Sequence, residues 1–129
     1  GYVTPKRKYL RLVPSLGCVL VYKDHEGTIP TRVIPVPGAG LIYPKQGAVP
    51  VGRKVFVHSV RMLVDEKPYT FLCENQVEKD TWVAALRAVG ERWRYSDQPG
   101  LQMMEMINKT GRAKTLMQAM FGSETKKET

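Results

Sequence analysis

The sequence predicts a mainly β domain, an antiparallel sandwich or barrel, closed by a C-terminal helix and followed by a helical extension. Short β-forming runs separated by turn residues fill residues 1–75, and a helical period begins after Asn75. A chain of 129 residues suffices for one domain with a single core. We therefore divide it into a domain over 1–95, a linker over 96–100, a helical extension over 101–122 and a polar tail over 123–129.

The strands are expected in the following order. Residues 9–13 and 18–22 are β-forming runs joined by a turn at 14–17, which predicts a hairpin. A third strand is expected over 32–36. Four prolines and four glycines interrupt residues 35–52, so this stretch is expected to be an edge strand or a long loop. Alternation over 55–64, a turn at 65–68 and a β-forming run from Tyr69 predict the last strands.

A helix is predicted to begin after Asn75. Asn75 and Glu78 have the spacing of an N-cap and its reciprocal partner. Trp82, Leu86 and Val89 recur at helical spacing, so we expect them to anchor the helix on the sheet.

The end of this helix is less regular in sequence. Trp93 continues the same face past Gly90 and is a candidate contact residue. Gly90 costs about 1 kcal/mol in a helix interior, which predicts a frayed or bent last turn.

A second helix is predicted over 101–121, with Gly111 weakening its middle. Its methionine-rich stripe suits an adaptable surface for a protein partner of the calmodulin type. The alternative, which we favour, is that the stripe folds back on the sandwich or belongs to the next domain of the parent protein. With Trp93, the candidate partner surface comprises Met103, Met106, Ile107, Met117, Met120 and Phe121.

The order of these elements resembles the pleckstrin homology (PH) domain family. GYV at residues 1–3, KRKYLRL at 6–12 and CVLVYKD at 18–24 are similar to the family's first three strands. YTFLCEN at 69–75 followed by EKDTWVAALRAV at 78–89 is similar to its last strand and closing helix, with Trp82 in the place of the family's helix tryptophan.

The resemblance implies a bent, seven-stranded antiparallel sandwich closed at one corner by the helix, with any ligand site at the early loops. Phosphoinositide-binding members use a lysine late in the first strand and a basic pair at the start of the second. Lys6, Arg7 and Lys8 match the second feature only. Thr4 and Pro5 leave almost no first loop, so we expect weak headgroup preference.

The whole net charge of +8 lies in residues 1–64, which carry ten Lys or Arg against Asp24 and Glu26. This excess predicts an anionic partner. The candidate headgroup-binding residues are Lys6, Arg7, Lys8, Arg11, Lys23 and Arg32. Phosphatidylserine or a phosphoinositide at a membrane surface is the expected ligand, and binding would be weak and salt-sensitive. The alternatives are an acidic protein surface, or a solvated basic strand with no ligand.

Other classes of function fit the sequence poorly. His25 and His58 stand alone, and no nucleotide-binding, hydrolase or zinc-protease motif is present, so we expect no enzyme, metal or cofactor. Few aromatics lie beside the cations, which argues against nucleic acid. No apolar run reaches membrane-spanning length. Two isolated cysteines, Cys18 and Cys73, favour a reducing, intracellular compartment. Together with the family resemblance and the basic cluster, this predicts a cytoplasmic module, peripheral at the membrane, from a larger signalling or cytoskeletal protein.

Overall fold

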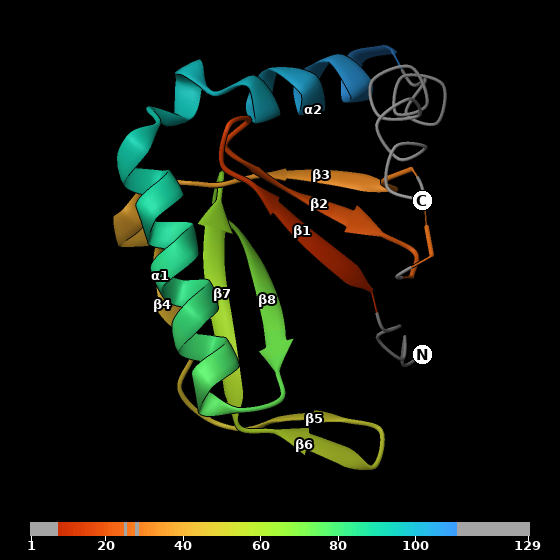
Figure 1. Cartoon of the computed structure of the whole chain (residues 1–129), viewed down its shortest axis with the longest axis vertical. Coiled ribbons are helices and arrows are strands. Elements are labelled where there is room, and N and C mark those ends of the chain that lie inside the picture. Colours follow the sequence, from red (N-terminus) through yellow and green to blue (C-terminus); the bar gives the residue numbers. More distant parts are fainter. Residues whose placement is uncertain (1–7, 25, 28, 111–129) are drawn as a thin grey trace. The chain divides into compact units, whose positions relative to one another are not determined.

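The computed structural model describes residues 8–24, 26–27 and 29–110, and its elements are labelled in Figure 1. They form mostly antiparallel sheets followed by C-terminal helices, which confirms the predicted fold class, and the described residues form no closed barrel. The chain divides into two compact units. Of the described residues, one unit holds 36–95, and the other combines those from Lys8 to Pro35 with those from Ser96 onwards. Each is described separately.

The unit that contains the early strands is a three-stranded sheet with one helix. Its strands, in the order β1-β2-β3, are β1 (Tyr9–Val13), β2 (Cys18–Tyr22) and β3 (Arg32–Pro35). The predicted hairpin is therefore confirmed, with Gly17 in its turn at φ +68°. Every residue of the central strand β2 is buried, and β1 and β3 pair with its two edges.

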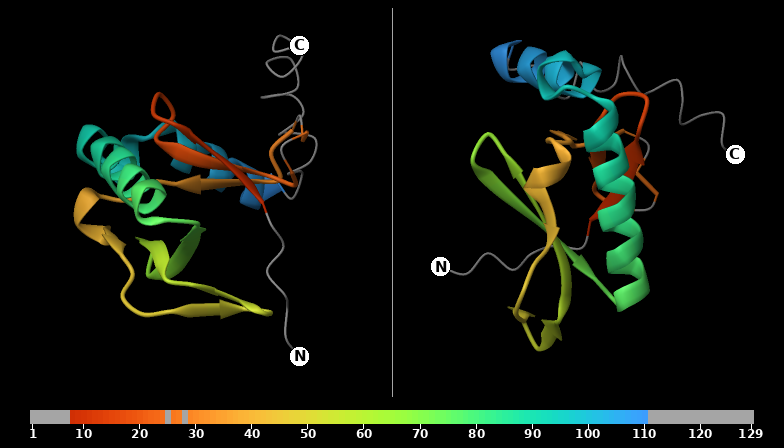
Figure 2. Two further views of the ribbon diagram at one scale, coloured as in Figure 1. Left: turned by 60° about the horizontal axis from the view of Figure 1, so that its bottom comes forward. Right: turned by 90° about the vertical axis from the view of Figure 1, so that its left-hand side faces the viewer.

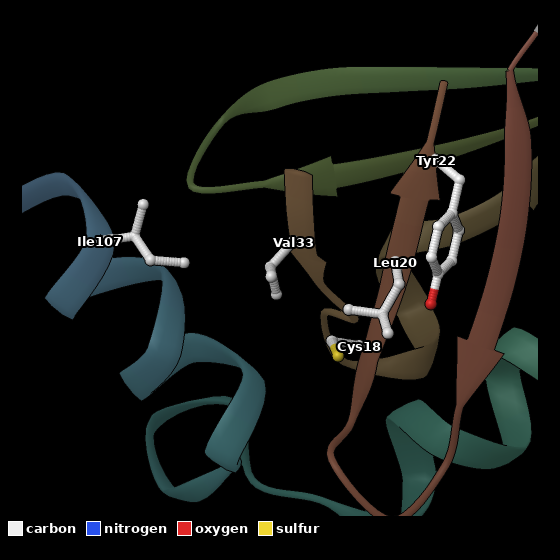
Figure 3. Packing of buried hydrophobic residues seen from close by; sticks show 5 residues of the cluster. All are labelled: Cys18, Leu20, Tyr22, Val33 and Ile107. Atoms are coloured by element: carbon white, nitrogen blue, oxygen red, sulfur yellow. The ribbon is translucent and has the colours of Figure 1, made fainter. Parts of the chain in front are cut away.

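Helix α2 (Pro99–Thr110) packs against β2 and β3 of this sheet. Ile107 lies in one buried cluster with Leu20, Tyr22 and Val33, as Figure 3 shows. At the start of the helix, the Gly100 amide donates to the carbonyl oxygen of Leu16 over 2.7 Å. The helix begins two residues earlier than predicted, and the second half of the predicted helix lies outside the described residues.

The other unit is built on a second sheet, β4-β7-β8, made of β4 (Ile42–Pro44), β7 (His58–Val64) and β8 (Lys67–Cys73). A separate hairpin joins β5 (Val49–Val51) to β6 (Lys54–Phe56). The proline-rich stretch thus contains an edge strand, as predicted, but also one strand of this hairpin. The described residues contain eight strands, one more than the seven that the family resemblance implied. The alternation predicted over 55–64 is interrupted at Val57, which belongs to neither β6 nor β7.

Helix α1 (Gln76–Arg92) runs along this second sheet, in contact with β4 and β7 (Figure 2). Asn75 caps it, since its Oδ1 accepts from the Glu78 amide over 2.8 Å. The predicted reciprocal bond would join the Glu78 carboxylate to the Asn75 amide. Instead, this carboxylate accepts from the amide of the preceding residue, Glu74, over 2.8 Å. The Arg87 Nε donates to the carbonyl oxygen of Ile42 and fastens the helix to β4.

The expected anchors of α1 are unequally buried. Leu86 and Val89 are buried, together with Val83, whereas Trp82 is half-buried and its ring lies 6.2 Å from that of Phe71. The helix is not weakened at Gly90, which is buried against the short 3-10 helix η1 (Ala39–Leu41). The predicted frayed end is therefore replaced by a regular helix that continues to Arg92.

Candidate functional site

The candidate site is the end of the β1-β2-β3 sheet where the basic residues gather. Tyr9 of β1 pairs with Tyr22 of β2, and their rings meet edge to face at 6.1 Å. Lys8 comes directly before β1 and Lys23 directly after β2, so the register brings both to the same end of the hairpin. Both lysines are exposed.

Arg32 opens the neighbouring strand at the same end of the sheet. It pairs with Val21 of β2, which pairs in turn with Leu10 of β1. Directly opposed residues share one face of an antiparallel sheet, and successive residues alternate between faces. Arg32 is therefore on the face of Leu10 and Val21, two rungs in from Lys8 and Lys23.

Arg11 lies on the other face of the sheet. It pairs with Leu20, which pairs with Val33, and both belong to the cluster that contains Ile107 of α2. Arg11 is exposed on the edge strand, beside the face that α2 covers. The structure thus brings Lys8, Lys23 and Arg32 together at one end and separates Arg11 from them. Lys6 and Arg7 lie outside the described residues.

Two carboxylates lie close to these cations in the chain. Asp24 follows Lys23 directly, and its Oδ1 accepts from the Glu26 amide over 3.0 Å. The described part of this end therefore holds three cations and two acidic residues. Its net positive charge is small without Lys6 and Arg7, which favours weak binding of an anionic surface.

The described part of the methionine stripe of α2 packs mostly against the sheet of its own unit. Ile107 is buried and Met103 packs against the same cluster, so the described part of the stripe folds back on the sheet. Met106 remains 48% exposed. Met117, Met120 and Phe121 lie outside the described residues.

Trp93 is half-buried at the C-cap of α1, and its amide donates to the carbonyl oxygen of Val89. The Arg92 guanidinium lies 5.8 Å from the centre of its ring. The tryptophan is therefore only partly accessible to a partner.

Comparison with known proteins places this arrangement in a family. The model of the PH domain matches residues 2–91. The chain belongs to the PH domain family. No curated protein and no solved structure matches it at a significant level. The match ends before α2, so this helix is an addition to the region that the family model covers.

A PH domain supports a general role in membrane targeting or protein interaction. No helix in the described part of the chain is long and apolar enough to cross a membrane. The same residues hold no cluster of three or more His, Cys, Asp or Glu suited to a metal ion.

The two cysteines are poorly suited to act as nucleophiles. His58 of β7 pairs with Cys73 of β8, a juxtaposition that the sequence did not reveal. Burial, with a smaller contribution from Glu78, raises the pKa of the Cys73 thiol to about 11. Burial raises the pKa of Cys18 to about 12. Both thiols are therefore protonated at neutral pH and are poor nucleophiles.

Sequence reasoning also missed an exposed apolar surface at the β5–β6 hairpin, where Val55 of β6 is 56% exposed and Val57, directly after β6, is 60% exposed. The available signal was the segment 51–57, VGRKVFV, in which a glycine and two basic residues are followed by three consecutive β-forming residues.

Proposed function

We propose that this PH domain is a noncatalytic module that binds anionic phospholipid surfaces weakly, as a cytoplasmic, peripheral part of a larger signalling or cytoskeletal protein. The register of β1 and β2 is the observation that carries the proposal, because it brings Lys8 and Lys23 to one end of the sheet with Arg32 beside them. Lys6 and Arg7 immediately precede Lys8 in the chain and add to the same basic segment.

The charges support weak rather than tight binding. Each Lys or Arg at an anionic membrane contributes about 1 kcal/mol. Five such residues correspond to a dissociation constant on the order of 0.1–1 mM, which Asp24 and Glu26 raise further. Binding of this kind is screened by salt, and membrane recruitment would depend on avidity from the rest of the parent protein.

A charge-reversal pair tests whether this particular end of the sheet binds the membrane. The whole chain is sedimented with vesicles that contain phosphatidylserine, and Lys8→Glu/Lys23→Glu is compared with Arg94→Glu/Lys109→Glu. All four side chains are exposed, and both double variants change the net charge equally. We expect the first pair to lose most of its binding and the second to keep most of it. Equal losses of vesicle binding in the two double variants would overturn the assigned site and show that the chain is attracted only by its net charge.

Protein interaction is the alternative function for this fold, and the same sedimentation experiment distinguishes it from lipid binding. A parent chain that sediments with no anionic vesicle, even at low salt, would overturn the lipid proposal and leave protein interaction as the function of the domain.

A further inference from the structure

The β5–β6 hairpin has a compact turn with a cation at its tip. Val51 pairs with Lys54, so the turn consists of Gly52 and Arg53 alone. Gly52 has φ +60°, which glycine adopts without strain at the first position of such a turn. Arg53 is exposed and makes no ion pair with any residue that the structure describes.

One face of this hairpin is apolar and open to solvent. Val55 pairs with Pro50, so the two share a face, and both are exposed. Among the described residues, Val77, Val57 and Val55 are the three most exposed large hydrophobics. Val57 directly follows the hairpin and Val77 lies in the first turn of α1, so all three belong to the same unit.

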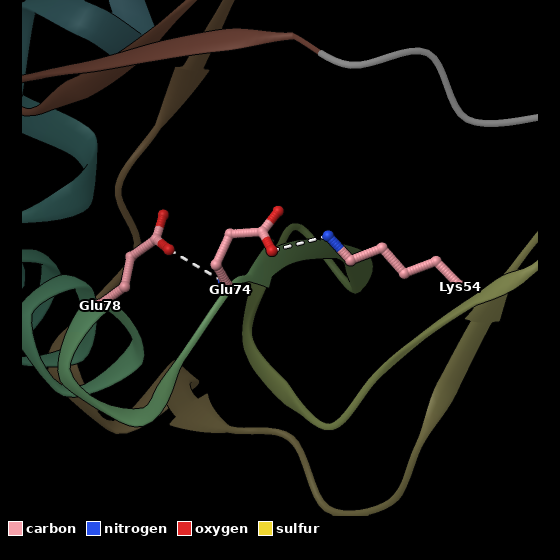
Figure 4. A network of polar contacts seen from close by, with 3 residues as sticks. All are labelled: Lys54, Glu74 and Glu78. Atoms are coloured by element: carbon pink, nitrogen blue, oxygen red, sulfur yellow. Dashed lines mark hydrogen bonds and ion pairs between the residues drawn. The ribbon is translucent and has the colours of Figure 1, made fainter.

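The hairpin is joined to the start of α1 by a short polar network, drawn in Figure 4. The Lys54 Nζ lies 2.6 Å from the Glu74 Oε2 and 4.7 Å from the centre of the Phe56 ring. The Glu74 amide donates in turn to the Glu78 carboxylate. Lys54 therefore neutralises the nearest carboxylate, and Arg53 remains as the uncompensated charge of the tip.

From this combination we propose that the β5–β6 hairpin, together with Val57 directly after it, is a second membrane contact, in which Val55 and Val57 enter the interface of an anionic bilayer while Arg53 meets the headgroups. Exposed apolar side chains beside a cation match the chemistry of that interface. The hairpin is poorly suited to pair with a strand of a partner protein, because each of its strands has only three residues and Pro50 of β5 lacks an amide donor. The inference rests on the proposed function, since both require an anionic membrane.

Leu41 provides a matched control in the same unit. It is 45% exposed in η1, which packs against Gly90 near the end of α1, whereas the hairpin is tied to Glu74 and Glu78 at its start. From Glu78 to Gly90 the helix rises about 18 Å. A surface that meets the bilayer at the hairpin should therefore leave Leu41 in water.

The test is an environment-sensitive fluorophore on a single introduced cysteine. The two native cysteines are buried, so a maleimide probe labels Val55→Cys, Val57→Cys or Leu41→Cys selectively. On phosphatidylserine vesicles at low salt we expect a severalfold rise in emission at 55 and 57 and none at 41. Val55→Asp/Val57→Asp should weaken vesicle binding about tenfold, from the loss of valine burial, whereas Leu41→Asp should not.

The outcomes separate the two proposals. Vesicle binding that depends on Lys8 and Lys23 but produces no emission change at 55 or 57 would overturn the hairpin contact alone. Emission that rises equally at 41 would also overturn it. No vesicle binding at all would overturn both proposals. A rise in emission with protein concentration in the absence of lipid would show that a second copy covers the hairpin, and would overturn the lipid assignment.

Discussion

Gly90 of α1 lies against the carbonyl oxygen of Pro37 so closely that a Cβ at this position would be 2.6 Å from that oxygen. The same Cβ would lie 2.8 Å from the Ala39 amide nitrogen. Both neighbours are backbone atoms, which cannot turn away as a side chain can. The glycine therefore permits the close packing of α1 on η1.

Gly90→Ala should destabilise the domain by about 2 kcal/mol through overpacking, although alanine is the better helix former by about 1 kcal/mol. Gly38→Ala is the control, because Gly38 has φ −54° and no atom within 4 Å of an added Cβ. It should be neutral or slightly stabilising. Urea unfolding of both variants measures the difference, and a stabilised Gly90→Ala variant would show that the contact is looser than described.

The turn between β7 and β8 holds two consecutive non-glycine residues in the left-handed region, Asp65 at φ 49° and Glu66 at φ 67°. Glycine adopts this conformation without the Cβ clash, so Glu66→Gly should stabilise the domain by about 1 kcal/mol. Glu66→Gln keeps the strain and removes the charge, and its free energy of unfolding should stay within about 0.5 kcal/mol of the parent. Destabilisation by the glycine would mean that the Glu66 side chain holds the turn.

Among the buried apolar residues of α1, Leu86 should cause the largest loss of stability when it is truncated. It is fully buried, and Leu86→Ala should lower the free energy of unfolding by about 3 kcal/mol. Val77→Ala removes methyl groups from a side chain that is 74% exposed on the same helix and should cost less than about 0.5 kcal/mol. Similar losses for the two variants would contradict the assigned burial.

Alkaline pH should destabilise the domain through Cys18. Burial raises the pKa of its thiol to about 12, above the ordinary value of 9.0. Its effect on stability is therefore constant below pH 9, and between pH 9 and 12 the unfolded chain loses a proton that the folded chain keeps. The free energy of unfolding falls over this range as pH rises, by about 1 kcal/mol per pH unit for one such group.

Cys18→Ala isolates this contribution from the lysines and tyrosines that titrate in the same range. Urea unfolding between pH 8 and 10.5 should give a shallower decline for the variant than for the parent. Parallel declines would show that the thiol ionises as readily in the folded protein as in the unfolded one.

Local patterns in the sequence predicted most of the fold. The cap at Asn75, the hairpin of β1 and β2 and the buried face at Leu86 and Val89 each depend on residues close in the chain. Gly90 was misread because its partner, η1, is about fifty residues away and leaves no trace in the helical period.

The candidate site was predictable only in part. The basic cluster was visible in the sequence, but its division between faces follows from the pairing of Arg11 with Leu20 and of Arg32 with Val21. A one-residue shift in register would reverse the faces, and no local pattern sets the register alone. The exposure of Val55 and Val57 was likewise hidden, because β-forming residues are ordinarily predicted to be buried.

Sedimentation of the whole chain with vesicles of neutral lipid, phosphatidylserine and several phosphoinositides, each at low and near-physiological salt, tests the central claim most directly. We predict binding that follows the total negative charge of the vesicle, is absent on neutral lipid and fades as salt rises. Selective binding to one phosphoinositide that survives near-physiological salt would contradict the weak basic surface and establish a headgroup pocket. Absence of binding to every vesicle would contradict lipid binding itself.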